Sequence, residues 1–211
     1  MEFKQNNLIK SLRVQPLIVV IRLEHQFFNI SHKREKLFLK IEKLLNYGVK
    51  NIEIGWDSNP EWVNLNLQIK NKFKSINIGI ESITSRESLD SIRSLDINYS
   101  MSPCFNKEIH LNAIKYNQLV IPGISNIENF KEAINLGYKI VKIFPVSKLG
   151  NSFIKELQDF KEKDIFFIGA GGIKSKNLKK LLKSGYDALD IGKELRNQTP
   201  DKDLEIWLKN Y

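Results

Sequence analysis

Short apolar segments alternate with longer amphipathic ones along nearly the whole chain. The apolar segments have the length of strands and are rich in Ile and Val. The segments between them repeat apolar residues every three to four positions, which predicts helices. We expect strands at residues 17–21, 51–54, 76–80, 98–102, 119–121, 139–145, 165–168 and 188–191. We expect helices at residues 3–13, 31–48, 58–74, 85–95, 106–116, 126–137, 152–160, 175–185 and 204–208.

After the short helix at the N-terminus, eight units of one strand and one helix follow, spaced about 25 residues apart. This alternation predicts a parallel sheet, and eight such units predict a closed (β/α)8 TIM barrel. An open doubly wound sheet is the alternative, but its glycine-rich turn usually follows the first strand. Here the glycine-rich run begins at Gly169, late in the chain. We therefore expect a single α/β domain over residues 1–211.

Composition narrows the class of protein. The chain of 211 residues is 42% hydrophobic, which suits one soluble domain with a substantial core. Cys104 is the only cysteine, so an internal disulfide and a cysteine metal cluster are both excluded. The apolar run at residues 17–21 is too short to cross a membrane, and residues 1–15 lack the apolar stretch of a secretory signal. We expect a cytoplasmic protein.

The formal net charge is +9, which raises the question of an anionic partner. The lysines are scattered over all the predicted helices, and no nucleic-acid-binding motif accompanies them. We therefore expect no nucleic acid partner. A small anionic substrate agrees equally well with this charge.

The strand at residues 139–145 carries a lysine where a buried side chain is expected. Side chains alternate between the two faces of a strand, so Lys142 lies opposite Val141 and Ile143. If helices cover those two residues, Lys142 points into the protein. A buried ammonium is costly unless it is paired or loses its proton, and a neutral lysine forms Schiff bases with carbonyl groups. The alternative is a lysine that reaches solvent from the strand end, or one held in a structural ion pair.

The same alternation brings further charged side chains to the interior. Glu53 lies between two isoleucines of its strand, and Arg22 continues the inward face of the first strand. Asp190 is a fourth candidate, as a structural counter-ion for Lys142, which would keep the amine charged and oppose its role as a nucleophile. Neutral Lys142 would attack a ketone and form an iminium, and Glu53 would act as general acid/base. Arg22 suits a substrate carboxylate or phosphate, or else a structural salt bridge at the strand end.

A second group of residues follows the last two strands. Gly171, Gly172 and Gly192 allow backbone N–H groups to approach an anion, and Lys193 adds charge. Loops in this position are the usual phosphate site of such barrels. The alternative interpretation is a set of tight turns.

The three histidines lack the spacing of metal ligands, and we expect no metal. His32 and His110 fall in predicted helices and are expected at the surface. His25, in the loop after the first strand, is a candidate for contact with substrate.

These segments resemble the 2-keto-3-deoxy-6-phosphogluconate aldolase / 4-hydroxy-2-oxoglutarate aldolase family over nearly the whole chain. The most specific is Lys142-x-Phe144-Pro145, which follows the turn expected at Pro122-Gly123. Supporting segments are residues 47–54, 121–124 and 171–173.

The resemblance implies a class I aldolase that cleaves a 2-keto-4-hydroxy acid to pyruvate and an aldehyde. The substrate would be 2-keto-3-deoxy-6-phosphogluconate or 4-hydroxy-2-oxoglutarate, and the aldehyde glyceraldehyde 3-phosphate or glyoxylate. It implies Lys142 as the Schiff-base lysine and Glu53 as the acid/base, with no metal or other cofactor. It also implies a homotrimer and substrate contacts at Ser82, Pro103 and Phe144.

The sequence departs from the family pattern at four positions. Asp57 stands where the family has an arginine, and Glu81 enters a turn that is otherwise small and glycine-rich. Ala170 and Lys193 replace residues near the phosphate site. The lysine chemistry is therefore better supported than the substrate. The alternatives are another phosphate-binding barrel enzyme (an isomerase or a thiamine-phosphate-synthase-like transferase), or a catalytically weakened binder of keto acids or sugar phosphates.

Overall fold

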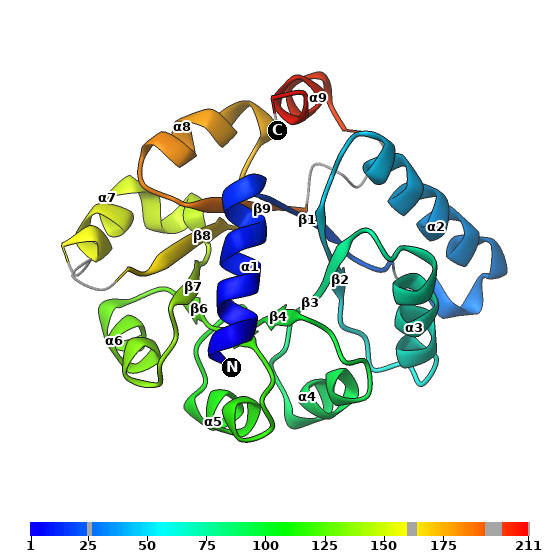
Figure 1. Ribbon diagram of the computed structural model, residues 1–211, viewed down its shortest axis with the longest axis horizontal. Coiled ribbons are helices and arrows are strands. Elements are labelled where there is room, and N and C mark those ends of the chain that lie inside the picture. The colour runs from blue at the N-terminus through cyan, green and yellow to red at the C-terminus, as the bar shows by residue number, and fades with distance from the viewer. Residues whose placement is uncertain (25–26, 160–163, 193–199, 211) are drawn as a thin grey trace.

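The computed structural model describes residues 1–24, 27–159, 164–192 and 200–210, and its strands form a ring surrounded by helices (Figure 1). The strands are β1 (Leu17–Ile21), β2 (Asn51–Gly55), β3 (Asn77–Glu81), β4 (Tyr99–Met101), β5 (Val120–Ile121), β6 (Gly123–Ile124), β7 (Ile140–Ile143), β8 (Phe166–Ala170) and β9 (Ala188–Ile191). The α-helices are α1 (Glu2–Val14), α2 (Ser31–Asn46), α3 (Trp62–Lys72), α4 (Arg86–Arg93), α5 (Lys107–Lys115), α6 (Ile127–Asn135), α7 (Val146–Gln158), α8 (Leu178–Lys183) and α9 (Lys202–Leu208). Two short 3₁₀ helices are η1 (Phe27–Asn29) and η2 (Ser175–Asn177).

The strands pair in the order β5-β4-β3-β2-β1-β9-β8-β7-β6, and every pair is parallel. The two ends of this order are consecutive in the chain, with Pro122 alone between them, so the sheet returns to its start. The (β/α)8 barrel is confirmed. Strand side chains are buried almost throughout, because helices cover the outer face and other strands the inner one.

The turn expected at Pro122-Gly123 is wrong. The chain stays extended there: Pro122 interrupts the hydrogen-bond ladder because it has no N–H, and β6 continues beyond it. The carbonyl of Pro122 accepts a hydrogen bond from the N–H of Lys142 at 2.9 Å. A Cβ on Gly123 would lie 2.4 Å from the carbonyl of Pro103, so only glycine fits here. This close approach places the Pro103 turn against β6, which pairs with β7.

Helix α3 begins at Trp62 rather than at residue 58, and two further helices differ from expectation in their local backbone. The helix after β7 begins at Val146 rather than near residue 152, and Gly150, with φ of +67°, interrupts it. The segment after Gly172 begins with the 3₁₀ turn η2 and continues into α8, which has only six residues. Both changes come from local backbone geometry, which apolar periodicity does not reveal.

Helix α1 lies across the ring of strands (Figure 1) and is tied to it by two buried glutamines. The side-chain amide of Gln5 donates to Gly137 O at 3.1 Å and accepts from Lys139 N at 2.7 Å, just before β7. Gln15, which follows α1, makes the same pair of bonds just before β2. Its partners are Gly48 O at 2.9 Å and Lys50 N at 2.8 Å. The helix therefore holds the starts of two strands.

Candidate active site

Lys142 lies inside the barrel, as the alternation of β7 predicted, and the residue is only 3% exposed. Its Nζ is 3.6 Å from Oδ2 of Asp190 on β9, and the strand β8 lies between these two strands. Their side chains therefore meet on the inner face of the ring. The ring of Phe144 lies 5.7 Å from the same amine. A cation in this position has a carboxylate partner and an aromatic face within reach.

Glu53 is fully buried on β2, and neither of its carboxyl oxygens has a hydrogen-bond partner among the described residues. Burial, assisted by the nearby Asp190, raises the pKa of Glu53 well above its usual range, although Lys142 acts in the opposite direction. Glu53 therefore holds its proton to a higher pH than an exposed glutamate does. A buried carboxyl with free hydrogen-bonding capacity and a raised pKa is suited to exchanging protons with a bound molecule.

Asp190 completes the buried cluster as the counter-ion that strand alternation suggested. Burial raises its pKa to about 6, and the neighbouring Lys142 limits this rise. The three strands β2, β7 and β9 thus direct an amine and two carboxyl groups into one interior. Two of these groups titrate closer to neutral pH than free carboxyls do.

Arg22 does not offer a free guanidinium to a ligand. Its Nε donates to Oε1 of Glu81 at 2.7 Å, and Nη2 donates to Oε2 at 3.4 Å. The hydrogen bond to Glu81 raises the pKa of Arg22 further. The alternative interpretation of this arginine, a salt bridge at a strand end, therefore describes the structure.

Three other expected substrate contacts lie at the carboxyl ends of strands. Phe144 is next to Lys142, and Pro103 packs against Gly123, which pairs with Lys142 in the register of β6 and β7. Ser82 follows β3 with a positive φ of 71°, an unusual backbone for a residue with a side chain. All three are half-buried. Their contact with a substrate remains a prediction.

Local backbone geometry and close packing explain why glycine occurs at the positions expected to bind phosphate. Gly171 and Gly172 have φ of 90° and 76°, and a Cβ on Gly171 would lie 2.8 Å from the ring of Phe144. A Cβ on Gly192 would approach Val20 to 3.1 Å. Tight backbone geometry thus accounts for these glycines, and anion binding there remains a prediction. Lys193 lies outside the described residues, as does His25.

Comparison with known proteins identifies the relationship. The model of the aldolase family "KDPG and KHG aldolase" matches residues 8–203. The chain belongs to this family. The KDPG and KHG aldolases are lyases that hold pyruvate on a lysine as a Schiff base, without a metal or other cofactor.

Relatives of the family are distant in sequence. The 2-dehydro-3-deoxy-6-phosphogalactonate aldolase of Escherichia coli (strain K12) is 26% identical over 118 residues, which are 56% of this chain and 58% of that protein. The 2-dehydro-3-deoxy-phosphogluconate aldolase of Treponema pallidum (strain Nichols) is 23% identical over 110 residues, 52% of each chain. The chain thus spans about half the length of the curated relatives it matches.

The fold extends further than the sequence similarity. The crystal structure of the KDPG aldolase from Legionella pneumophila, with pyruvate captured as a covalent carbinolamine intermediate, matches with a TM-score of 0.75 and 20% identity. The match covers 96% of this chain and 90% of that one. The chain therefore shares the fold of this enzyme over nearly its whole length.

Tyr99 is a residue of the barrel interior that we did not single out from the sequence of this aldolase-family chain. Its ring fills the space beside Gly79, where a Cβ would lie only 2.4 Å away. Burial, together with the charge of Glu53, raises the pKa of Tyr99 well above its usual range. Its hydroxyl has no hydrogen-bond partner among the described residues. The sequence contained a signal for the buried position of Tyr99, because strand alternation places it on the same face as the apolar Met101.

The expectation that His110 lies at the surface of the family's barrel is wrong. The ring is fully buried, with Nδ1 2.9 Å from the hydroxyl of Tyr138 and Nε2 3.3 Å from Oγ of Ser102. Burial lowers the pKa of His110 to about 4, so the ring is neutral at physiological pH. Because Ser102 precedes Pro103, this network supports the Pro103 turn. His32 is exposed, as expected.

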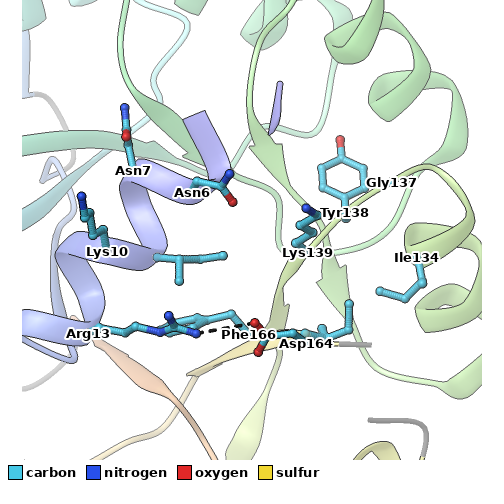
Figure 2. A pocket seen from close by; sticks show the side chains of 12 residues that line it. Asn6, Asn7, Lys10, Arg13, Ile134, Gly137, Tyr138, Lys139, Asp164 and Phe166 are labelled. Atoms are coloured by element: carbon cyan, nitrogen blue, oxygen red, sulfur yellow. Dashed lines mark ion pairs between the residues drawn. The ribbon is translucent and has the colours of Figure 1, made fainter. Parts of the chain in front are cut away.

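A cavity of about 690 Å³ lies at the other end of this aldolase-family barrel, between α1 and the starts of β7 and β8 (Figure 2). Its lining includes Lys10, Arg13, Tyr138 and Lys139, and an ion pair of 3.8 Å joins Arg13 to Asp164. It contains none of the charged groups around Lys142. In the part of the chain that the structure describes, no cluster of metal-ligating side chains occurs and no helix is long and apolar enough to cross a bilayer.

The raised pKa of Glu53 predicts how the stability of this family member depends on pH. In the unfolded chain a glutamate ionises near pH ~4.3, whereas the native state holds the proton to higher pH. The native state therefore binds more protons above this pH, and the free energy of unfolding falls as pH rises. We expect the stability advantage of Glu53→Gln over wild type to grow as the pH rises above the ordinary ionisation range of glutamate.

Urea unfolding at a series of pH values measures this advantage. Glu61→Gln is the matched control, because Glu61 is a half-exposed carboxylate paired with Arg34 at the surface. Its difference from wild type is expected to vary little with pH. An equally flat difference for Glu53→Gln would contradict the prediction.

Proposed function

We propose that this protein is a class I aldolase that cleaves a 2-keto-4-hydroxy acid to pyruvate and an aldehyde. The observation that carries the proposal is the buried amine of Lys142, paired with Asp190 and sharing the barrel interior with the unpartnered carboxyl of Glu53. Membership of the KDPG and KHG aldolase family supports the same chemistry. The specific substrate is a 2-keto-3-deoxy-6-phosphogluconate-like or a 4-hydroxy-2-oxoglutarate-like acid, which would give glyceraldehyde 3-phosphate or glyoxylate.

The first half of the reaction forms the covalent intermediate. The neutral amine of Lys142 attacks the ketone carbon of the substrate, and water leaves to give an iminium. Asp190 accepts the proton that the ammonium must lose, and its raised pKa suits this transfer. Asp190 then returns this proton to the departing hydroxyl of the carbinolamine, which leaves as water. The iminium keeps a positive charge, which the restored carboxylate of Asp190 stabilises in the protein interior.

The second half breaks the carbon–carbon bond. Glu53, as carboxylate, takes the proton of the C4 hydroxyl, and the C3–C4 bonding electrons move to the iminium to give an enamine and the free aldehyde. Glu53 then returns the proton to C3, and water hydrolyses the resulting iminium to pyruvate and Lys142. Positive charge on the iminium favours the ionised form of Glu53 when it is needed as a base.

We further infer that Ser82, Pro103 and Phe144 line the pyruvate part of the site, and that Gly171, Gly172, Gly192 and Lys193 hold the distal anion. All of these positions except Lys193, which lies outside the described residues, are at the carboxyl ends of strands, where barrel enzymes bind their substrates. A cytoplasmic homotrimer is the assembly that the family resemblance favours. Light scattering coupled to gel filtration measures the mass of the assembly directly.

Reductive trapping tests the proposal. Incubation of the wild-type protein with pyruvate and sodium borohydride is expected to reduce the iminium to a stable secondary amine on Lys142. Mass spectrometry of the intact chain and its peptides detects one added pyruvate-derived group at that residue. Folded wild-type protein that gains no adduct would refute the mechanism. Stabilisation by keto acids without an adduct would instead favour a binding protein, and a metal requirement would favour another barrel enzyme.

A further inference from the structure

The carboxyl end of the barrel contains an arginine whose anion-binding side is already occupied. Two guanidinium nitrogens of Arg22 donate to the two carboxylate oxygens of Glu81, at 2.7 and 3.4 Å. This is the arrangement in which arginine binds carboxylate and phosphate groups of ligands. Gly55 lies between the two residues, and a Cβ there would be 3.6 Å from Oε1 of Glu81. The pair therefore spans from β1 to the end of β3 across β2.

The two partners differ greatly in their access to solvent. The side chain of Arg22 is 61% exposed, whereas that of Glu81 is 4% exposed. A ligand that enters from solvent therefore meets the arginine first, with the carboxylate held behind it. Only part of the donor capacity of the guanidinium remains available to such a ligand.

Glu81 also acts on the reaction centre. After burial, which is the main cause, its charge contributes to the raised pKa of both Glu53 and Asp190. Three buried carboxyl groups, those of Glu53, Glu81 and Asp190, therefore lie near two cations, the buried Lys142 and the exposed Arg22. Behind the exposed Arg22, an incoming carboxylate meets the buried carboxylate of Glu81, and like charges in a poorly solvated site repel strongly.

We propose that Glu81 is a specificity-determining residue, an internal carboxylate that competes with the carboxylate of the substrate for Arg22. The inference rests on the proposed function for the location of the site. Wild-type protein then binds an anionic donor weakly and discriminates little between it and an uncharged carbonyl compound of the same shape. Removal of the charge at Glu81 frees Arg22 and creates selectivity for the anion.

Matched ligands isolate this effect. Lactate and propane-1,2-diol share a carbon skeleton, but lactate ends in a carboxylate and the diol ends in a hydroxymethyl group. Neither compound can form an imine. We expect Glu81→Gln to tighten lactate binding by roughly threefold to tenfold, the value of one hydrogen-bonded charge at a partly exposed site. Binding of the diol is expected to remain within about twofold. Titrations followed by NMR measure these millimolar affinities. Pyruvate and hydroxyacetone form the corresponding pair for the reactive ligands.

Glu61→Gln provides the control, because it removes a carboxylate from another arginine pair, Arg34–Glu61 at 2.8 Å, and changes net charge equally. A second variant, Arg22→Gln, tests the proposal even if Glu81→Gln does not fold. In the wild-type background, Arg22→Gln is expected to cost less than about twofold in lactate affinity, because Glu81 already occupies the arginine. The double variant is expected to lose the gain of Glu81→Gln.

Each result has one meaning. An unchanged ratio of lactate to diol affinity in Glu81→Gln, or an equal change in Glu61→Gln, overturns the proposal, as does a tenfold loss in Arg22→Gln alone. Neither lactate nor the diol can form an imine, so the binding comparison stands or falls without a Schiff base. Failure of the aldolase mechanism would appear separately, as the absence of a trapped pyruvate adduct.

Discussion

Alanine in place of Lys142 is expected to lower kcat for aldol cleavage by about 10⁴-fold or more, because the covalent route loses its nucleophile. The variant is also expected to lose the borohydride-trapped pyruvate adduct completely. It should remain folded, because burial already raises the pKa of Asp190 to about 6 and the carboxyl can take up a proton when its partner is removed. A coupled assay of pyruvate release and intact-mass spectrometry measure both effects.

Lys139→Ala is the control for this experiment. Lys139 lies three positions earlier and has a partly exposed side chain that pairs with Glu2 at 2.6 Å. Its replacement removes the same charge while the barrel interior is unchanged, and we expect activity and adduct to persist. If Lys142→Ala retains more than a few per cent of the wild-type rate while Lys139→Ala loses activity, the assignment of the reactive amine is wrong.

Glutamine in place of Glu53 is expected to lower kcat by roughly 10²–10⁴-fold, the usual contribution of a positioned general acid/base. Glutamine preserves the size of the side chain but cannot carry the proton between the C4 hydroxyl and C3. Trapping of pyruvate by borohydride is expected to survive in this variant, although more slowly, because Lys142 is intact. Stopped-flow cleavage rates and the extent of adduct formation separate the two steps.

The Glu61→Gln variant again controls for the loss of a carboxylate and should match wild type. The proposed role of Glu53 would be refuted by a wild-type cleavage rate in Glu53→Gln. Loss of the adduct together with cleavage, in a folded variant, would place Glu53 in the formation of the iminium instead.

The fold was largely predictable because its signal repeats. Each strand is a short apolar run and each helix a longer periodic one, and the alternation within strands placed Lys142, Glu53 and Asp190 in the interior. The helix and strand boundaries that were predicted wrongly depend on local backbone geometry. Pro122 suits an extended backbone as well as a turn, so the Pro-Gly pair alone did not reveal that the strand continues beyond it.

The site was predictable only in part, because sequence patterns do not identify partners. Arg22 was placed at the correct strand end, but its pairing with Glu81 depends on two segments 59 residues apart. His110 belongs to a helix, and helical position alone did not reveal that Tyr138 and Ser102 enclose its ring. Strand alternation places Tyr99 on the inward face of β4, so its position could have been predicted. Its proximity to Glu53 could not, because an aromatic residue in a strand is usually an ordinary core residue.

The two glutamines of the N-terminal region have a practical consequence for work on this protein. Gln5 secures the approach to the strand that carries Lys142, and Gln15 secures the approach to the strand that carries Glu53. A purification tag or a deletion that pulls the first helix away would loosen both supports together. Activity lost in such a preparation would then reflect damage remote from the chemistry, so the contacts of α1 should be left intact when the enzyme is assayed.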